Sequence, residues 1–191
     1  LKFDPKGLLN QGRIVDPPKM DDRSLFRYKP NYRATQITTA LDWSDWTGLS
    51  GAVEMCNNNG ACRKVSAGVM CPSYRVTKDE KHVTRGRANT LRLALSGQLG
   101  PDAISSKEMS ETMELCVSCK ACRRECPTGV DMAKMKIEHK SAYVQKNGLS
   151  IRDRLVGYLP KYAKIASKYH YLSNLRNNLP GLPGLTEQTL G

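Results

Sequence analysis

The sequence predicts a mainly α-helical fold that follows an extended, irregular N-terminal arm. Beyond residue 51, apolar residues recur at helical spacing, and capping boxes at residues 77–80 and 105–108 mark two helix starts. Residues 1–50 lack this pattern and are interrupted by turns such as Asp4-Pro5-Lys6-Gly7. Only 6% of the 191 residues are aromatic, so we expect a small core.

Within the arm, residues 35–43 are rich in β-formers. We expect Trp43 and Trp46 to anchor it on the core rather than to stack on a ligand. The two capped helices follow. The apolar positions expected to face the core are Ala88, Leu91, Leu95 and Leu99 in the first of them, and Met109, Met113 and Cys116 in the second.

Three further helical stretches complete the pattern. The first runs from Pro127 to Asn147-Gly148, the second starts at Ser150 and breaks at Pro160, and the third covers residues 161–178. The Pro- and Gly-rich stretch after them indicates a linker. The predicted parts are an arm (1–50), a helical domain (51–147), C-terminal helices (148–178) and a linker (179–191).

Four of the seven cysteines fall within the run Cys116-Val-Ser-Cys119-Lys-Ala-Cys122-Arg-Arg-Glu-Cys126-Pro. The spacing C-x2-C-x2-C-x3-C-P is typical of iron–sulfur proteins, in which three thiolates bind one cluster and the fourth binds another. Zinc sites usually combine two C-x2-C pairs that lie far apart in the sequence. An odd number of cysteines also argues against a disulfide scaffold. The run therefore predicts a [4Fe–4S] cluster.

The fourth thiolate of this cluster must come from elsewhere in the chain. Cys71-Pro72 repeats the Cys-Pro ending of the motif upstream, so Cys71 is the expected fourth ligand. The predicted cluster ligands are thus Cys71, Cys116, Cys119 and Cys122.

By the same rule, Cys126 would join Cys56 and Cys62 in a second, weaker iron–sulfur site. Asn59 stands where the intact motif has its middle cysteine, so at most three thiolates are present. Four interpretations stay open: a cluster with an Asn or solvent ligand, a three-iron cluster, a different metal, or buried free thiols.

The formal net charge of +12 has two explanations. One is an anionic partner, such as nucleic acid, a membrane surface or an acidic protein. The other is an uneven distribution of charge in a larger protein, with Lys and Arg near the anionic cluster. We favour the second, because no basic run reaches the length of a nucleic-acid-binding tail. The sequence shows neither a membrane span nor a signal peptide.

Several stretches resemble a known family. Residues 2–14, Lys-Phe-Asp-Pro-Lys-Gly-Leu-Leu-Asn-Gln-Gly-Arg-Ile, resemble the closing stretch of FAD-linked oxidases of the vanillyl-alcohol-oxidase type, with Gln11 in place of the usual Pro. Residues 70–74 (Met-Cys-Pro-Ser-Tyr), 84–88 (Thr-Arg-Gly-Arg-Ala) and 116–127 resemble the iron–sulfur segment of fused FAD and Fe–S dehydrogenases. That family includes D-2-hydroxyglutarate dehydrogenases and relatives of glycolate oxidase and D-lactate dehydrogenase.

The resemblance covers about residues 1–160 and implies an α-helical ferredoxin-like Fe–S domain. It also implies an upstream flavin domain that carries FAD, with the arm as its tail, and a downstream cysteine-rich domain after the linker. A chain that opens at Leu1 is what we expect of a piece of a longer polypeptide. No flavin site is visible, so we expect neither FAD binding nor catalysis by this chain alone.

The leading functional prediction is an electron-transfer module of an FAD-dependent 2-hydroxy-acid dehydrogenase, which relays electrons from flavin to an acceptor. The alternatives are a zinc-stabilised basic module that binds nucleic acid or protein, and a structural linker whose cluster does not cycle. We expect no nucleic-acid partner and no catalytic residue in this chain. We expect the protein to lie in the cytoplasm, and its attachment to the inner face of the membrane is the alternative location. Arg85, Arg87 and His82 are expected to be surface charges of a helix rather than an anion site.

Overall fold

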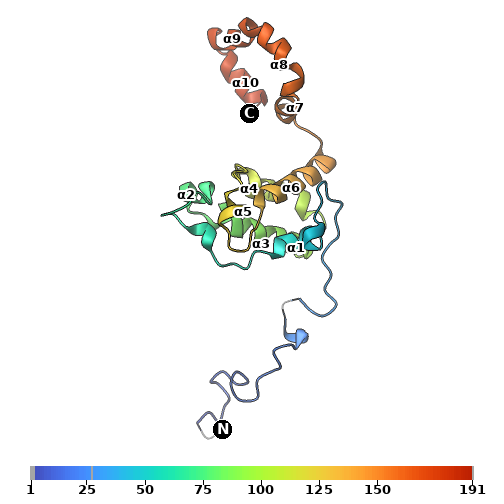
Figure 1. Cartoon of the computed structure of the whole chain (residues 1–191), viewed down its shortest axis with the longest axis vertical. Coiled ribbons are helices and arrows are strands. Elements are labelled where there is room, and N and C mark those ends of the chain that lie inside the picture. The colour runs from blue at the N-terminus through green and yellow to red at the C-terminus, as the bar shows by residue number, and fades with distance from the viewer. Residues whose placement is uncertain (1–2, 27, 191) are drawn as a thin grey trace. The chain divides into compact units, whose positions relative to one another are not determined.

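The computed structural model describes residues 3–26 and 28–190 and separates into two units, Leu1–Gln36 and Ile37–Gly191 (Figure 1). In the first unit, the predicted turn at Asp4 forms, since the N–H of Gly7 donates to the Asp4 carbonyl at 3.2 Å. The Asp4 carboxylate also accepts from the N–H groups of Leu8 and Leu9, at 2.9 and 2.8 Å. One short 3-10 helix, η1 (Arg23–Leu25), follows within the described residues of this unit.

The second unit is built from helices, and the described residues contain no strand, so the mainly α fold class is confirmed. Its α-helices are α1 (Leu49–Glu54), α2 (Pro72–Thr77), α3 (Thr84–Leu95), α4 (Lys107–Glu114), α5 (Ala121–Glu125), α6 (Met132–Asn147), α7 (Ile151–Gly157), α8 (Leu159–Lys168), α9 (His170–Asn178) and α10 (Leu182–Leu190). Short 3-10 helices lie between them: η2 (Ser44–Trp46), η3 (Ala61–Arg63), η4 (Glu80–His82) and η5 (Ala103–Ser105).

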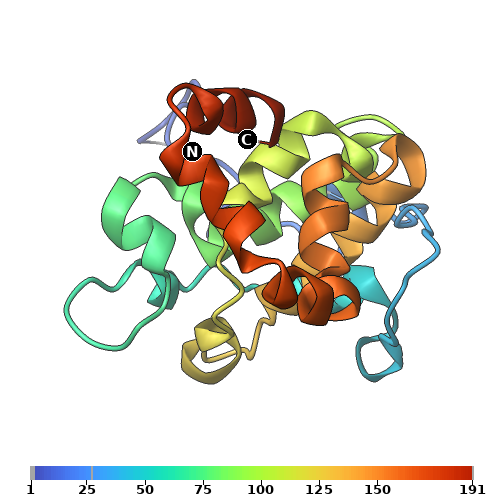
Figure 2. The same ribbon diagram turned by 90° about the horizontal axis from the view of Figure 1, so that it is seen from above.

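Helices α3, α4 and α6 pack together around one core, with α1 against α3 (Figures 1 and 2). Most of the predicted inward positions are buried, including Leu91, Met109 and Met113. Leu99 is 50% exposed, because α3 ends at Leu95 and a turn follows, and Cys116 is only partly buried. The core is rich in methionine and, in line with the low aromatic content of the chain, poor in aromatic side chains.

The capping boxes mark the right regions but the wrong residues. Thr77 ends α2 instead of starting a helix, because Lys78 adopts a left-handed conformation and closes α2 with a hydrogen bond to the Tyr74 carbonyl. Asp79 then caps η4, and α3 begins at Thr84. In the second box Ser106, rather than its neighbour, accepts the capping bond from the N–H of Met109 at 3.1 Å.

Residues 37–48 were expected to belong to the arm, yet they are fastened to the helical unit. The buried carboxylate of Glu138 on α6 accepts three hydrogen bonds of 2.8 Å, from the N–H groups of Ala40 and Leu41 and from Nε1 of Trp43. Trp43 is 4% exposed, and Lys134 Nζ lies 4.2 Å from its ring centroid. The anchoring role of Trp43 is confirmed, and the compact unit that contains it begins at Ile37.

The described side chains of helices α7 to α10 add nothing to this core. Of the described side chains after His139 none is buried, in contrast to those of α3, α4 and α6. Helix α10 falls within residues 179–191, which we expected to form a linker. Across the described residues, none of the helices has both the length and the apolar character needed to cross a bilayer.

Candidate iron–sulfur site

The four predicted ligands of the first cluster line one small cavity of about 20 Å³. They reach it from separate elements: Cys71 is the N-cap of α2, Cys116 follows α4, Cys119 lies in the next loop, and Cys122 lies in α5. Cys71 and Cys122 are buried, whereas Cys119 is exposed. The chain therefore brings an upstream thiol to the same cavity as the three thiols of the C-x2-C-x2-C run.

The loop that carries Cys119 has a specific backbone. Ser118 and Lys120 both have positive φ, 53° and 60°, which winds the chain tightly between Cys116 and α5. The N–H of Cys116 donates to the carbonyl of Met113 at 3.0 Å as the loop leaves α4. This tight path places three thiols around the cavity within seven residues of sequence.

The upstream loop, residues 56–62, repeats this backbone. Asn58 and Gly60 have φ of 62° and 77°, at the positions that correspond to Ser118 and Lys120. Both loops also share the sequence Glu-x-Cys-x-x-x-x-Ala-Cys-Arg, at residues 54–63 and 114–123. Asn59 therefore occupies the position of Cys119, as the spacing predicted.

The side chain of Asn59 holds its own loop together. Its Oδ1 accepts from the N–H of Ala61 at 2.8 Å, and its Nδ2 donates to Asn57 Oδ1 at 2.5 Å. An amide oxygen is a hard, neutral ligand that suits an iron–sulfur cluster poorly. The residue thus stabilises the turn in a position where the other loop offers a thiolate.

Positive charge and hydrogen-bond donors surround the first cavity. Thr84 Oγ1 and Arg87 Nη1 each lie 3.7 Å from Cys71 Sγ. Lys136 Nζ donates to the carbonyl of Cys116 at 2.5 Å; burial lowers the pKa of Lys136, and the Cys116 thiolate opposes that shift. A purely thiolate donor set with N–H and O–H groups directed at sulfur fits an iron–sulfur cluster.

Arg87 was expected to be a surface charge, and this expectation is wrong. Its side chain is 0% exposed, because α3 turns it into the core. Arg85 is partly exposed, and pairs with Glu80 at 2.5 Å. The Thr-Arg-Gly-Arg-Ala sequence therefore contributes one arginine to the cavity and one to an ion pair.

Glu125 is a site residue that the sequence analysis missed. Its carboxylate accepts from the N–H groups of Val69 and Met70, at 2.9 and 3.1 Å, and these bonds lower the pKa of Glu125. The bonds tie the segment before Cys71 to α5, which carries Cys122. The position of Glu125 directly before Cys126 was the only feature of the sequence that could have marked it as a site residue.

Of the second predicted site, Cys56 and Cys62 are buried. Burial raises the pKa of the Cys62 thiol, and the negative charges of Cys56 and Cys71 raise it further. Although burial acts to raise it, the pKa of Cys126 is lowered by hydrogen bonds from Thr128 and from backbone N–H groups. Element η3, which holds Cys62, contacts α5, the helix just before Cys126. A shared site of the three thiols stays a prediction.

Throughout residues 3–26 and 28–190, no three Cys, His, Asp or Glu side chains come close enough to bind a single metal ion. Four thiolates around one zinc would each lie at about 2.3 Å from it and would crowd together. The cysteines instead surround a cavity that they share.

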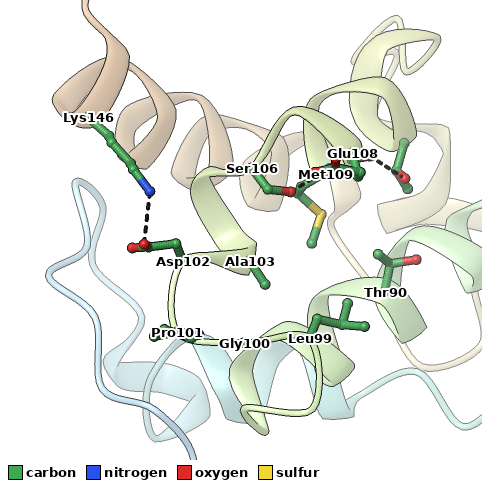
Figure 3. Close-up of a pocket in the computed structure, with 11 residues that line it drawn as sticks. Thr90, Leu99, Gly100, Pro101, Asp102, Ala103, Ser106, Glu108, Met109 and Lys146 are labelled. Atoms are coloured by element: carbon green, nitrogen blue, oxygen red, sulfur yellow. Dashed lines mark hydrogen bonds and ion pairs between the residues drawn. The ribbon is translucent and has the colours of Figure 1, made fainter.

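A larger pocket of about 430 Å³ lies between the end of α3, η5 and α4 (Figure 3). Leu99, Ala103 and Met109 give it an apolar lining, and an ion pair of 3.0 Å joins Lys146 to Asp102 at its edge. No cysteine lines this pocket. It therefore offers no thiolate ligand for an iron–sulfur cluster.

Comparison with known proteins agrees with this geometry. Residues 52–130 match the family model described as a 4Fe-4S dicluster domain. This match confirms the [4Fe–4S] cofactor predicted from the cysteine run and does not favour the zinc-stabilised module.

Curated relatives indicate which kind of iron–sulfur protein this chain resembles. D-2-hydroxyglutarate dehydrogenase of Escherichia coli (strain K12) is 28% identical over 99% of this chain and 22% of its own length. The enzyme of the same name from Pseudomonas putida is 26% identical, over 82% of this chain and 19% of its own length. A probable glycolate oxidase iron-sulfur subunit of Bacillus subtilis (strain 168) is 28% identical over 45% of this chain and 19% of its own length. The resemblance to the iron–sulfur segment of such dehydrogenases is confirmed.

The chain spans about a fifth of the length of these curated relatives. No solved structure matches the chain.

Proposed function

We propose that the chain is the electron-transfer module of a larger FAD-dependent 2-hydroxy-acid dehydrogenase. The observation that carries the proposal is the cavity lined by Cys71, Cys116, Cys119 and Cys122. The names of the relatives support a 2-hydroxy acid such as D-2-hydroxyglutarate as the substrate of the whole enzyme. The partners would be an upstream flavin domain that holds FAD, a downstream cysteine-rich domain and an electron acceptor.

In this proposal a [4Fe–4S] cluster at the four cysteines supplies one-electron redox chemistry. The thiolates hold it, and the donors Thr84 and Arg87 stabilise negative charge on Cys71. The buried methionines Met70 and Met132 exclude water from the inner side of the cavity. The exposed Cys119 leaves one edge open to a redox partner. No described residue of the cavity needs to transfer a proton for this role.

The test begins with the chain purified without oxygen and reconstituted with iron and sulfide. We expect a brown protein with nearer four than eight irons per chain, because only one site has four thiolates (about four irons per [4Fe–4S] cluster). A reversible one-electron reduction should appear in a titration followed by electron paramagnetic resonance (EPR). Zinc uptake in place of iron would contradict the proposal, and a cluster that does not cycle would favour a purely structural role. The chain alone should not oxidise D-2-hydroxyglutarate with an artificial acceptor.

The substitution Asn59→Cys is expected to raise the iron content toward about eight per chain, because it restores the missing thiolate on a loop that already has the required backbone. Asn57→Cys is the matched control: it adds a thiol to the same loop, at the position that corresponds to Val117, and should not gain iron. Iron and sulfide analysis after reconstitution measures both. If the two variants bind equal amounts of iron, position 59 does not face a second cluster.

A further inference from the structure

The guanidinium of Arg87 lies fully buried beside the cluster cavity. Its Nη1 donates to Cys71 Sγ at 3.7 Å and to the His82 carbonyl at 2.9 Å. Its Nη2 donates to Ser73 Oγ at 3.1 Å, and its Nε to the Thr112 carbonyl at 2.9 Å. The oxygen acceptors fix the plane of the guanidinium, so that one N–H is directed at the sulfur.

The charge of Arg87 lacks a carboxylate partner. Within the described parts of the chain no Asp or Glu forms an ion pair with it, although Arg85 on the same helix pairs with Glu80. A buried cation without an anion is costly to maintain in a folded protein. Among the groups to which Arg87 donates, Cys71 is the one that becomes anionic when it binds a cluster.

Gly86 explains how the arginine reaches this position. A Cβ at Gly86 would lie 1.9 Å from the carbonyl oxygen of Glu80, so only glycine allows α3 to pack this closely on η4. The close contact brings Arg87 onto the carbonyl of His82 and, from there, onto Cys71. Because only glycine fits at position 86, α3 packs closely on η4, and this close packing places the charged side chain of Arg87 in the core.

We propose that Arg87 sets the reduction potential of the cluster at Cys71. When the cluster gains one electron, the site becomes one unit more negative, and a buried cation hydrogen-bonded to a ligand sulfur favours that state. Arg87 therefore raises the potential relative to a site without it. The inference rests on the proposed function only in requiring a reducible cluster at Cys71.

The test is an EPR-monitored titration with dithionite of the reconstituted chain and of Arg87→Gln. The variant should shift the reduction equilibrium about tenfold toward the oxidised cluster, which is about 59 mV for a one-electron couple. Arg87→Lys, which keeps the charge, should recover part of the shift. The control is Arg85→Gln, on the same helix but paired with Glu80, which should leave this potential unchanged.

The outcomes separate the inference from the proposed function. A wild-type chain without a reducible cluster would refute the proposed function. A loaded Arg87→Gln variant with the wild-type potential would overturn the inference, even if its melting temperature fell. If the variant does not fold, wild-type protein labelled with ¹⁵N-arginine provides the second measurement, because an N–H directed at a ligand sulfur should give a ¹⁵N coupling in pulsed EPR of the reduced cluster. Absence of that coupling would equally overturn the inference.

Discussion

Glu138→Ala is expected to lower the free energy of unfolding by about 3 to 5 kcal/mol. The substitution removes a carboxylate that is 2% exposed and leaves three donors without their acceptor: the N–H groups of Ala40 and Leu41 and Nε1 of Trp43. Because these bonds fasten residues 37–48 to α6, the loss should also release Trp43 from the core. Urea unfolding followed by circular dichroism measures the free energy, and tryptophan fluorescence in the absence of urea reports the release.

The matched control is Glu111→Ala on the surface of α4. Glu111 forms an ion pair of 3.6 Å with Lys81, and both side chains are about half exposed. Exposed pairs contribute little, so this change should cost about 0.5 kcal/mol or less. Glu138→Gln keeps the size of the side chain and one acceptor oxygen, so its loss of unfolding free energy should lie between those of Glu138→Ala and Glu111→Ala. Equal losses for Glu138→Ala and Glu111→Ala would show that the carboxylate does not hold the segment.

Cys119→Ser is expected to abolish the visible absorbance of the reconstituted chain and to lower its melting temperature by about 10 °C. Cluster binding contributes to the folding free energy where the apolar core is small, and this core holds few large aromatic side chains. Cys119 is exposed, so the substitution itself disturbs no packing. The measurement is a thermal melt of wild-type and variant protein, each before and after treatment with a chelator.

The chelator-treated wild-type protein supplies the internal comparison. It should melt at the temperature of Cys119→Ser, because both lack the cluster and otherwise share the same packing. If the variant loses its colour but has the same melting temperature as the cluster-loaded wild-type protein, the cluster binds without stabilising the fold.

Local patterns in the sequence predicted much of this fold and site. Helical periodicity located the inward faces of α3 and α4, and the C-x2-C-x2-C spacing located three of the cavity thiols, because both signals arise from neighbouring residues. The end of α2 at Thr77 and the start of α3 at Thr84 were missed because they depend on η4, a turn without periodicity.

The residues that the sequence analysis missed act over long separations. Glu138 binds a segment nearly a hundred positions upstream, and Glu125 holds the backbone before Cys71. Arg87 could not be told from a surface arginine, because its burial depends on the contact of Gly86 with Glu80. Such pairings leave no periodic trace in the sequence and appear only when the chain is folded.

The two cysteine loops are copies of one backbone turn that carry different residues at the position of Cys119. In one copy Asn57 and Asn59 close the turn with their own side-chain hydrogen bonds, so its shape does not depend on a thiolate at position 59. In the other copy, Cys119 forms no such bond and is free to serve as a ligand. Because each loop is shaped by its own residues, the loop at residues 56–62 keeps this turn without a thiol at position 59. The shape of the turn and the number of thiols on it are thus independent, so a thiol can be gained or lost in one loop while the backbone of both loops stays the same.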